Sequence, residues 1–276
     1  MKRLVALAFA CALPLSAPVL AQQPCAHSQP QALTLDTAGV SRILFDIGPH
    51  TLRLQGASGG DHRIEGRACA SSQSDVERLS VAQERRGDVL HVTLAREDRR
   101  GISLGSRYAY LSLEGRVPDD LLIQLKVGSG DARLTGASAA SIDVGSGDAE
   151  LREVRGLVTA KVGSGDIKLH DIGALNLLSI GSGDVEASRI GGNVDVGSVG
   201  SGDLELSGAG GDVEIGSLGS GDIDLADIAG NVVVGSIGSG DLDVRDVRGD
   251  LTVRAKGSGD IDHRGIGGTI DLPRRR

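Results

Sequence analysis

The residues with the clearest capacity for chemistry are eight aspartates, each the last residue of a Gly-Ser-Gly-Asp sequence. They are separated by 17, 18, 18, 19, 19, 19 and 19 residues. If such a repeat stacks in register, its aspartates form a ladder of carboxylates along one corner, and carboxylates are hard oxygen ligands that suit Ca²⁺. The candidate metal ligands are Asp131, Asp148, Asp166, Asp184, Asp203, Asp222, Asp241 and Asp260.

The same aspartates also fit a structural role. Asp can hydrogen-bond to the backbone of its own turn, with its charge in water. Calcium-binding nonapeptide solenoids use a Gly-Gly-any-Gly-any-Asp-any-apolar unit. In this chain the Asp directly follows the Gly, and one corner per repeat carries Ser-Gly-Asp. The turn-forming role is therefore preferred. Ca²⁺ remains the alternative, and the sequence indicates no other cofactor.

Residues that support catalysis are dispersed along the chain. The histidines form neither a His-any-any-any-His metal pair nor a Ser/His/Asp order typical of hydrolases. Paired carboxylates such as Asp222 and Asp224 recur in many repeats, whereas an active site normally occurs once. The sequence thus predicts no catalytic or cofactor-binding residues and a protein that is not an enzyme. The histidines are His27, His50, His62, His91, His170 and His263.

The apolar residues between the aspartates keep fixed places, which argues against low-complexity disorder despite 42 glycines. Each half-repeat reads Gly, Asp or Asn, apolar, any, apolar, two spacers, apolar. Ile223 and Leu225 alternate with polar residues in one half, and Val232 and Val234 have the same spacing in the other. A period of two is typical of a strand with one buried face. A repeat of about 20 residues with two short strands and two glycine corners predicts one solenoid coil.

The fold class is therefore all-β: a parallel β-solenoid of about eight 17–19-residue coils with an N-terminal β cap. The cap includes the strand-like segments 42–47, 51–54, 89–94 and 108–113, with a hairpin turn at 85–88. The expected organisation is a signal peptide at 1–21, a β cap region at 22–126, the Gly-Ser-Gly-Asp solenoid at 127–272 and a basic tail at 273–276.

The N-terminus indicates the compartment. Lys2 and Arg3 precede an apolar run that ends in small residues before Gln22, which is typical of a secretory signal peptide. We therefore expect export to the periplasm, the outer surface or the medium. In an oxidising compartment Cys25 and Cys69 are expected to form a disulfide, with two independent thiols as the alternative.

Charge and composition narrow the partners. Residues 128–272 hold 24 acidic and 11 basic side chains, and no aromatic residue follows Tyr110. An acidic solenoid repels nucleic acid. Sugar rings commonly stack on aromatic side chains, which the solenoid lacks. We expect no nucleic acid partner and no transmembrane segment, and the protein or surface partner and the oligomeric state are left open.

These residues carry a family resemblance. Strand pairs, the Val117-Pro118 step and the serial Ser-Gly-Asp-apolar-any-apolar units resemble the bacterial putative-adhesin family of β-strand-repeat proteins, and are similar to the related autotransporter-adhesin head domains. The resemblance covers roughly residues 40–272. It implies a secreted, right-handed β-helix without established catalytic residues.

The expected function is accordingly a non-enzymatic structural or interaction module of the cell envelope or surface, of adhesin type. Two alternatives remain. One is a Ca²⁺-binding solenoid stabilised by metal along the aspartate ladder. The other, implied by the variety within the family, is an accessory role in envelope-stress signalling.

Overall fold

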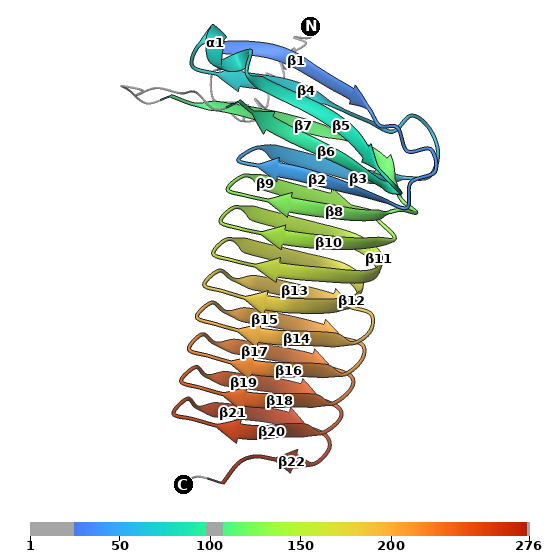
Figure 1. Cartoon of the computed structure of the whole chain (residues 1–276). Coiled ribbons are helices and arrows are strands. Elements are labelled where there is room, and N and C mark those ends of the chain that lie inside the picture. The colour runs from blue at the N-terminus through green and yellow to red at the C-terminus, as the bar shows by residue number, and fades with distance from the viewer. Residues whose placement is uncertain (1–24, 98–106, 275–276) are drawn as a thin grey trace, which may run out of the picture.

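A computed structural model describes residues 25–97 and 107–274, so the expected signal peptide lies outside the described residues. The chain forms a rod of stacked coils (Figure 1), and parallel strand pairs link successive coils along its length. The predicted parallel β-solenoid is confirmed. Each regular coil contains a leading strand, the Gly-Ser-Gly-Asp corner, a trailing strand and a second corner.

The leading strands stack into one face of the rod and the trailing strands into the other. The leading face consists of β6 (Val89–Arg96), β2 (Arg42–Gly48), β8 (Leu122–Val127), β10 (Ala139–Val144), β14 (Val194–Val199), β16 (Val213–Leu218), β18 (Val232–Ile237), β20 (Leu251–Lys256) and β22 (Ile270–Asp271). The trailing face consists of β7 (Ala109–Pro118), β3 (Thr51–Ala57), β9 (Asp131–Thr135), β13 (Val185–Ile190), β15 (Leu204–Ala209), β17 (Ile223–Ile228), β19 (Leu242–Val247) and β21 (Ile261–Ile266). Two longer strands, β11 (Asp148–Val162) and β12 (Asp166–Ile180), begin on the trailing face and continue onto the leading face.

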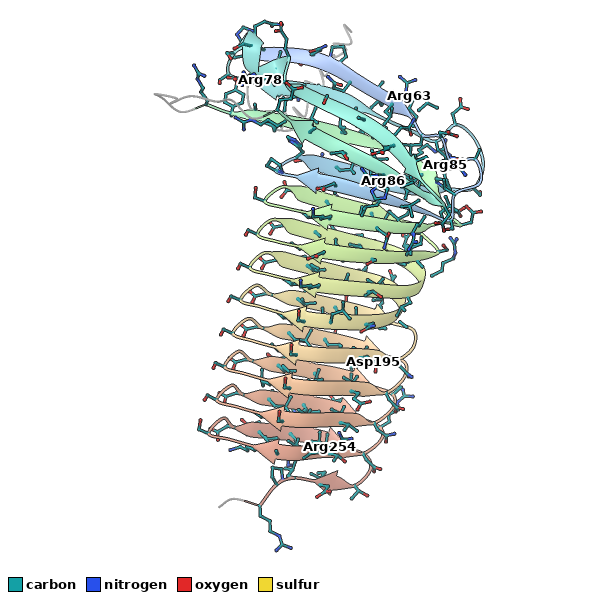
Figure 2. The ribbon with its side chains drawn as sticks, viewed as in Figure 1. Arg63, Arg78, Arg85, Arg86, Asp195 and Arg254 are labelled. Carbon is teal, nitrogen blue, oxygen red and sulfur yellow. A yellow bond between two sulfur atoms is a disulfide. The ribbon has the colours of Figure 1, made fainter. Side chains whose placement is uncertain are left out.

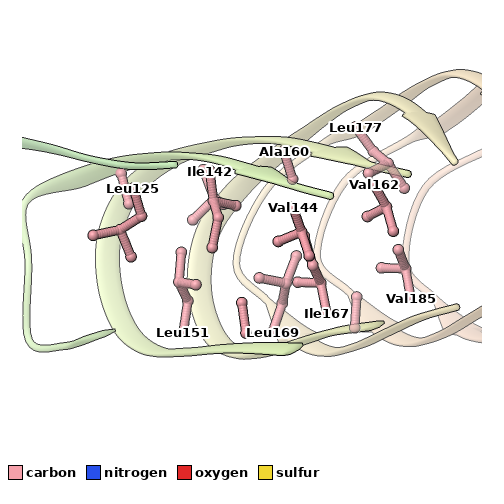
Figure 3. Packing of buried hydrophobic residues seen from close by; sticks show 14 of the residues in the cluster. Leu125, Ile142, Val144, Leu151, Ala160, Val162, Ile167, Leu169, Leu177 and Val185 are labelled. Atoms are coloured by element: carbon pink, nitrogen blue, oxygen red, sulfur yellow. The ribbon is translucent and has the colours of Figure 1, made fainter. Parts of the chain in front are cut away.

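The core is a set of aliphatic columns between the two faces. In β17 the buried residues are Ile223, Leu225 and Ile228, while Asp224 is exposed. The two spacers before Ile228 include Asp227, whose φ of 57° lies in the left-handed region. That residue turns the strand so that Ile228 points inward again. Figure 3 shows the columns facing each other, with Leu125, Ile142, Ala160 and Leu177 on the leading wall.

The second glycine of each Gly-Ser-Gly-Asp corner is required sterically. Gly221 is buried, and a Cβ on it would lie 1.9 Å from the carbonyl oxygen of Gly202 in the previous coil. The corresponding distance is 1.8 Å at Gly240 and Gly259. Because the obstacle is backbone rather than a movable side chain, no other residue fits while the coils keep their spacing.

Coil length increases along the chain because the second corner and the leading strand each gain a residue. The register of β11 with β12 shifts between Ala160 and Lys161, which pair with Leu177 and Ser179. Leu178 is therefore extra, and its side chain is 50% exposed. Gly197, Gly216 and Gly235 occupy the equivalent place in the later coils. Those coils repeat every 19 residues because their second corner is also one residue longer, with four positions from Ile190 to Val194 where the coil before has three from Ile172 to Leu175.

The N-terminal region extends both faces and closes them with antiparallel strands. β4 (Arg63–Ala70) pairs with β7, β1 (His27–Thr34) pairs with β4, and β5 (Leu79–Arg86) pairs with β6. The predicted hairpin turn is confirmed between Arg86 and Val89, with Gly87 at a φ of 64°. The four-residue helix α1 (Gln73–Val76) is not indicated by the sequence patterns used above.

The coil of β2 and β3 lies inside the stack. It pairs with β6 and β7 on one side and with β8 and β9 on the other. The parallel ladders therefore continue across residues 126 and 127, where the sequence places the boundary between cap and solenoid. Cys25 and Cys69, the two cysteines expected to pair, are joined by a disulfide with a Cα–Cα distance of 5.6 Å, which ties the start of the described chain to β4.

Candidate functional site: the charged trailing face

The aspartates of the Gly-Ser-Gly-Asp corners stack in one column, as their spacing predicts. From Asp166 to Asp241 each carboxylate accepts a hydrogen bond from the backbone N–H of the aspartate in the next coil. The bond from Asp222 N–H to Asp203 Oδ1 is 2.8 Å, and that from Asp241 N–H to Asp222 Oδ1 is 3.1 Å. Equivalent bonds join Asp184 to Asp166, Asp203 to Asp184 and Asp260 to Asp241.

The first corners stack differently. The N–H of Asp131 donates to the His50 carbonyl, and the N–H of Asp148 donates to the Gly130 carbonyl. These bonds use backbone acceptors, so the Asp148 N–H does not donate to the Asp131 carboxylate, and the first carboxylate-to-backbone bond of this column among the described residues is the one to Asp166. Thr51 occupies the place of the aspartate in the preceding coil.

The second corner contains a parallel ladder that the sequence analysis did not single out. Asn193, Asp212, Asn231 and Asp250 occupy it in successive coils. Each side-chain Oδ1 accepts the backbone N–H of the next coil, at 2.7 Å from Asn231 N to Asp212 Oδ1 and 2.9 Å from Asp250 N to Asn231 Oδ1. Since Asn serves as well as Asp, an acceptor oxygen is sufficient for this stacking and a charge is not needed.

A second row of charges lies beside the aspartate column on the outer surface of the trailing face. Its members stand two residues after each corner aspartate, so they point to the same side. In the later coils the row is acidic throughout: Glu186, Glu205, Asp224, Asp243 and Asp262 are neighbours in register. Strands stack about 4.8 Å apart, so these like charges repel one another.

Toward the N-terminus the same row contains basic residues. Arg53 pairs with Arg133, Arg133 with Glu150, and Glu150 with Lys168. Arg133 and Arg152 both form ion pairs with Glu150. Burial alone would raise the pKa of the Glu150 carboxyl, but the hydrogen bond from Arg152 and the charge of Arg133 outweigh it and hold that pKa below its usual value.

Three hollows follow one another along this face. The first, about 510 Å³, is lined by residues of β3, β4, β7 and β9 and contains four arginines. The second, about 390 Å³, lies between Arg53 and Lys168. The third, about 410 Å³, is lined by the paired carboxylates of the later coils, from Asp166 to Asp224. Together they form a groove that passes from an arginine-rich end to an acidic end.

The arginine-rich end was not found from the sequence. Arg53, Arg63, Arg116 and Arg133 are far apart in the chain and reach one hollow only because their strands are neighbours. One sequence pattern could have indicated that these arginines face outward. In predicted strands they alternate with apolar residues, as Arg53 does between Leu52 and Leu54.

A polar cluster on β12 and β13 has the residue types of a hydrolytic triad. His170 Nδ1 lies 2.7 Å from Ser188 Oγ, and Asp171 forms an ion pair with Arg189, whose hydrogen bond lowers the pKa of the Asp171 carboxyl. Arg189 also contacts His170 Nε2. Nε2 also lies 3.6 Å from Asp171 Oδ2, so which ring nitrogen donates and which accepts depends on the tautomer of His170. Asp171 is bound by Arg189 and lies beyond hydrogen-bond distance of the imidazole, so it does not orient the ring as the acid of a hydrolytic triad does.

The described residues contain no group of three or more His, Cys, Asp or Glu side chains placed to hold a metal ion. The eight corner aspartates form a column rather than a cage, and from Asp166 to Asp241 each uses Oδ1 in the ladder. Calcium binding along the column stays a prediction. Within the same residues, none of the helices has the length and apolar character needed to cross a membrane.

The repeats match a known family. Residues 145–266 match the family described as "Putative auto-transporter adhesin, head GIN domain", which confirms the resemblance drawn from the Ser-Gly-Asp units. No curated protein matches the chain in sequence.

One solved structure has a similar fold, and others have weaker similarity. A protein from Parabacteroides distasonis, described as a putative lipid binding protein, is 19% identical, with a TM-score of 0.51 over 85% of this chain and 96% of its own. A putative adhesin from Bacteroides fragilis is 16% identical, with a TM-score of 0.42 over 89% of this chain and 96% of its own. The first of these likenesses supports the fold alone.

Proposed function

Given repeats that match the auto-transporter adhesin head family, we propose that the protein is an exported, non-enzymatic interaction module of adhesin type, acting at the cell envelope or surface. Binding is assigned to the trailing face. The observation that carries this assignment is the groove of three consecutive hollows, which passes from arginine-rich to acidic along one side of the rod.

The rigidity of the rod supports a binding role. Side chains on stacked strands are held at fixed spacing by the backbone ladders, so the groove presents an ordered array of charges without folding on contact. The leading face differs: glycines and serines occupy many of its outward places, as in Gly197-Ser198 and Gly216-Ser217. Charge complementarity of the kind that selects partners is therefore concentrated on the trailing face.

Two observations support a protein without enzymatic activity. In the Ser188, His170 and Asp171 cluster the carboxylate is bound by Arg189 and lies 3.6 Å from the imidazole, so it does not orient the ring as a catalytic triad requires. The other polar groups of the face recur from coil to coil, whereas catalytic groups converge at one place. The description of the Parabacteroides neighbour as lipid-binding is not extended to this chain, because the groove is lined mainly by charged side chains.

The proposal is tested by comparing variants of the two faces. The purified chain is immobilised, and its binding to cell-envelope and surface fractions is measured with and without chelator. Arg53→Gln with Arg116→Gln, and Asp224→Asn with Asp243→Asn, alter the trailing face. Asp195→Asn with Arg254→Gln alters the leading face as the matched control. Binding that the trailing-face variants reduce and the control leaves unchanged supports the proposal. Equal loss in all variants, or no binding by the wild type, contradicts it.

A further inference from the structure

We propose that the arginine-rich end of the groove is a binding site for a single anionic sugar residue, one that carries a phosphate, sulfate or carboxylate group. The inference rests on the proposed interaction function and specifies its ligand. The site is the hollow of about 510 Å³ between β3, β4, β7 and β9. That volume lies within the range typical of small-molecule sites, about 300–1,000 Å³.

Four guanidinium groups converge on this hollow from four strands. Arg63 stands directly opposite Arg116 in the antiparallel pair of β4 and β7, and Arg53 stands beside Arg133 in the parallel pair of β3 and β9. Like charges in such cross-strand positions destabilise a sheet. Repulsion between paired arginines therefore destabilises the sheet at two adjacent places. An anion bound between the guanidiniums would cancel this repulsion.

The arginines differ in how far they are neutralised. Arg63 forms an ion pair with Glu65 at 3.3 Å, and Arg133 forms one with Glu150. Arg53 and Arg116 have no ion pair within the part of the chain that the structure describes, and both are exposed. These two guanidiniums are therefore free to form bidentate hydrogen bonds with an oxyanion, the geometry for which arginine is best suited.

The remaining lining favours a sugar over a bare ion. The described lining residues include no aromatic side chain, so such a sugar would be held by hydrogen bonds and not by ring stacking. Asp61, Glu65 and Glu114 carry carboxylates, and Gln55 carries an amide. Such groups accept hydrogen bonds from hydroxyls, so a ligand with one anionic group and several hydroxyls satisfies both kinds of side chain. With four arginines against three carboxylates, the hollow balances about one negative charge.

The surroundings exclude dense polyanions. The chain has a net charge of −8, and the groove continues into the corner aspartates and the acidic row. An anionic membrane or a heavily sulfated polymer lying along the rod would meet these carboxylates and be repelled. The geometry therefore points to an isolated anionic group that enters the hollow by itself.

The test titrates the purified chain with glucose 6-phosphate and with glucuronate, using glucose, inorganic phosphate, heparin and phosphatidylglycerol vesicles as comparison ligands. We expect an anionic sugar to bind more tightly than glucose or inorganic phosphate, and no stronger binding to heparin or vesicles. Arg53→Gln and Arg116→Gln should each weaken anionic-sugar binding about tenfold or more, because a hydrogen bond to a charged group is lost.

Arg254→Gln is the matched control, because Arg254 is exposed on β20 and lies at the opposite end of the rod from Arg63 (Figure 2). Its affinity should match the wild type. Thermal melting tests folding: Arg116→Gln should not lower the melting temperature, since it removes the repulsion from Arg63. The proposal is overturned if no anionic sugar binds, if inorganic phosphate or vesicles bind as well as the sugars, or if the control weakens binding as much as Arg116→Gln. Envelope binding that Asp224→Asn and Asp243→Asn abolish would still support the broader function in that case.

Discussion

The coils before β13 and those after it solve the same stacking problem in different ways. In the earlier part, corner lengths vary, β11 and β12 run through the second corner as continuous strands, and the first aspartates stack through backbone carbonyls. In the later part every coil has 19 residues, and both corners stack through side-chain oxygens. The earlier coils also carry the mixed charges, and the later ones carry mainly acidic charge.

The difference indicates that a uniform sequence produces a uniform coil surface, whereas a varied sequence places different residues at each level of the rod. A regular coil presents the same residues at every level, so its outer surface repeats. A hollow lined by residues of different types requires strands with different sequences, as β3, β4, β7 and β9 have. The predictions below probe this contrast.

The largest expected effect is that of Gly221→Ala in the regular coils. The Cβ of the alanine would overlap the Gly202 carbonyl oxygen, so we expect the free energy of unfolding to fall by at least about 4 kcal/mol. This effect is larger than that of most overpacking substitutions, because the obstacle is backbone and not a movable side chain. Urea denaturation measures it. Gly191→Ala is the control, since its Cβ meets nothing closer than 3.4 Å. A similar small loss for both variants would contradict the steric role of the corner glycine.

Removal of the disulfide should affect the irregular part alone. Replacing Cys25 and Cys69 with Ser removes a cross-link between residues with a sequence separation of 44. The free energy of unfolding should then fall by about 3 kcal/mol, which is typical for a disulfide of this span. Hydrogen exchange should then accelerate in β1 and β4 and remain unchanged in β15 to β19. Faster exchange along the whole rod would show that the two parts unfold as one unit.

A pH effect is expected at the first corner, where His50 stands in place of the second glycine. His50 is 1% exposed, its Nδ1 accepts the Leu111 N–H, and burial followed by the charge of Arg96 lowers its pKa from 6.5 to about 4. The unfolded chain therefore takes up a proton below about pH 6.5 while the folded chain does not. The contribution of neutral His50 to the free energy of unfolding is complete above that pH and is lost as the pH falls toward 4. The loss between pH 7 and pH 5 is roughly 2 kcal/mol.

The measurement is the difference in free energy of unfolding between the wild type and His50→Asn at each pH. Asn keeps an acceptor near the Leu111 N–H and does not titrate, so effects of other groups cancel. Parallel pH profiles for the two proteins would show that His50 does not contribute.

A smaller effect is expected at the aspartate ladder. Asp222→Ala removes the acceptor of the Asp241 N–H and should cost about 1 kcal/mol. Asp222→Asn keeps an acceptor and removes a like charge beside Asp224, so its stability should equal or exceed that of the wild type. A large loss on Asp222→Asn would show that the charge itself is required, contrary to the Asn/Asp ladder of the second corner.

The smallest effect is expected from calcium. If the corner aspartates act as turn acceptors, 1 mM Ca²⁺, a concentration on the order of the dissociation constants of weak extracellular sites, should leave the melting temperature nearly unchanged. A rise that Asp222→Asn and Asp241→Asn both reduce would instead support the metal-stabilised alternative.

The solenoid could be predicted from local sequence patterns. The fixed places of Ile223, Leu225 and Ile228 and their counterparts encode which side of each strand is buried, and the Gly-Ser-Gly-Asp sequences encode where each coil turns, because these are local properties of strands and corners. The pairing of Cys25 with Cys69 could also be expected, since two cysteines permit one bond.

The order of the N-terminal coils and the groups that meet at the hollow depend on contacts between distant parts of the chain. The insertion of the β2 and β3 coil between β6/β7 and β8/β9 depends on which strands meet in space, and local patterns do not encode this. The hollow shared by Arg53, Arg63, Arg116 and Arg133 follows from that order. The corner aspartates could be placed in a column from their spacing, but the structure was needed to show that most of them accept the next coil's N–H. That contact joins residues 18 or 19 positions apart and depends on how the coils stack.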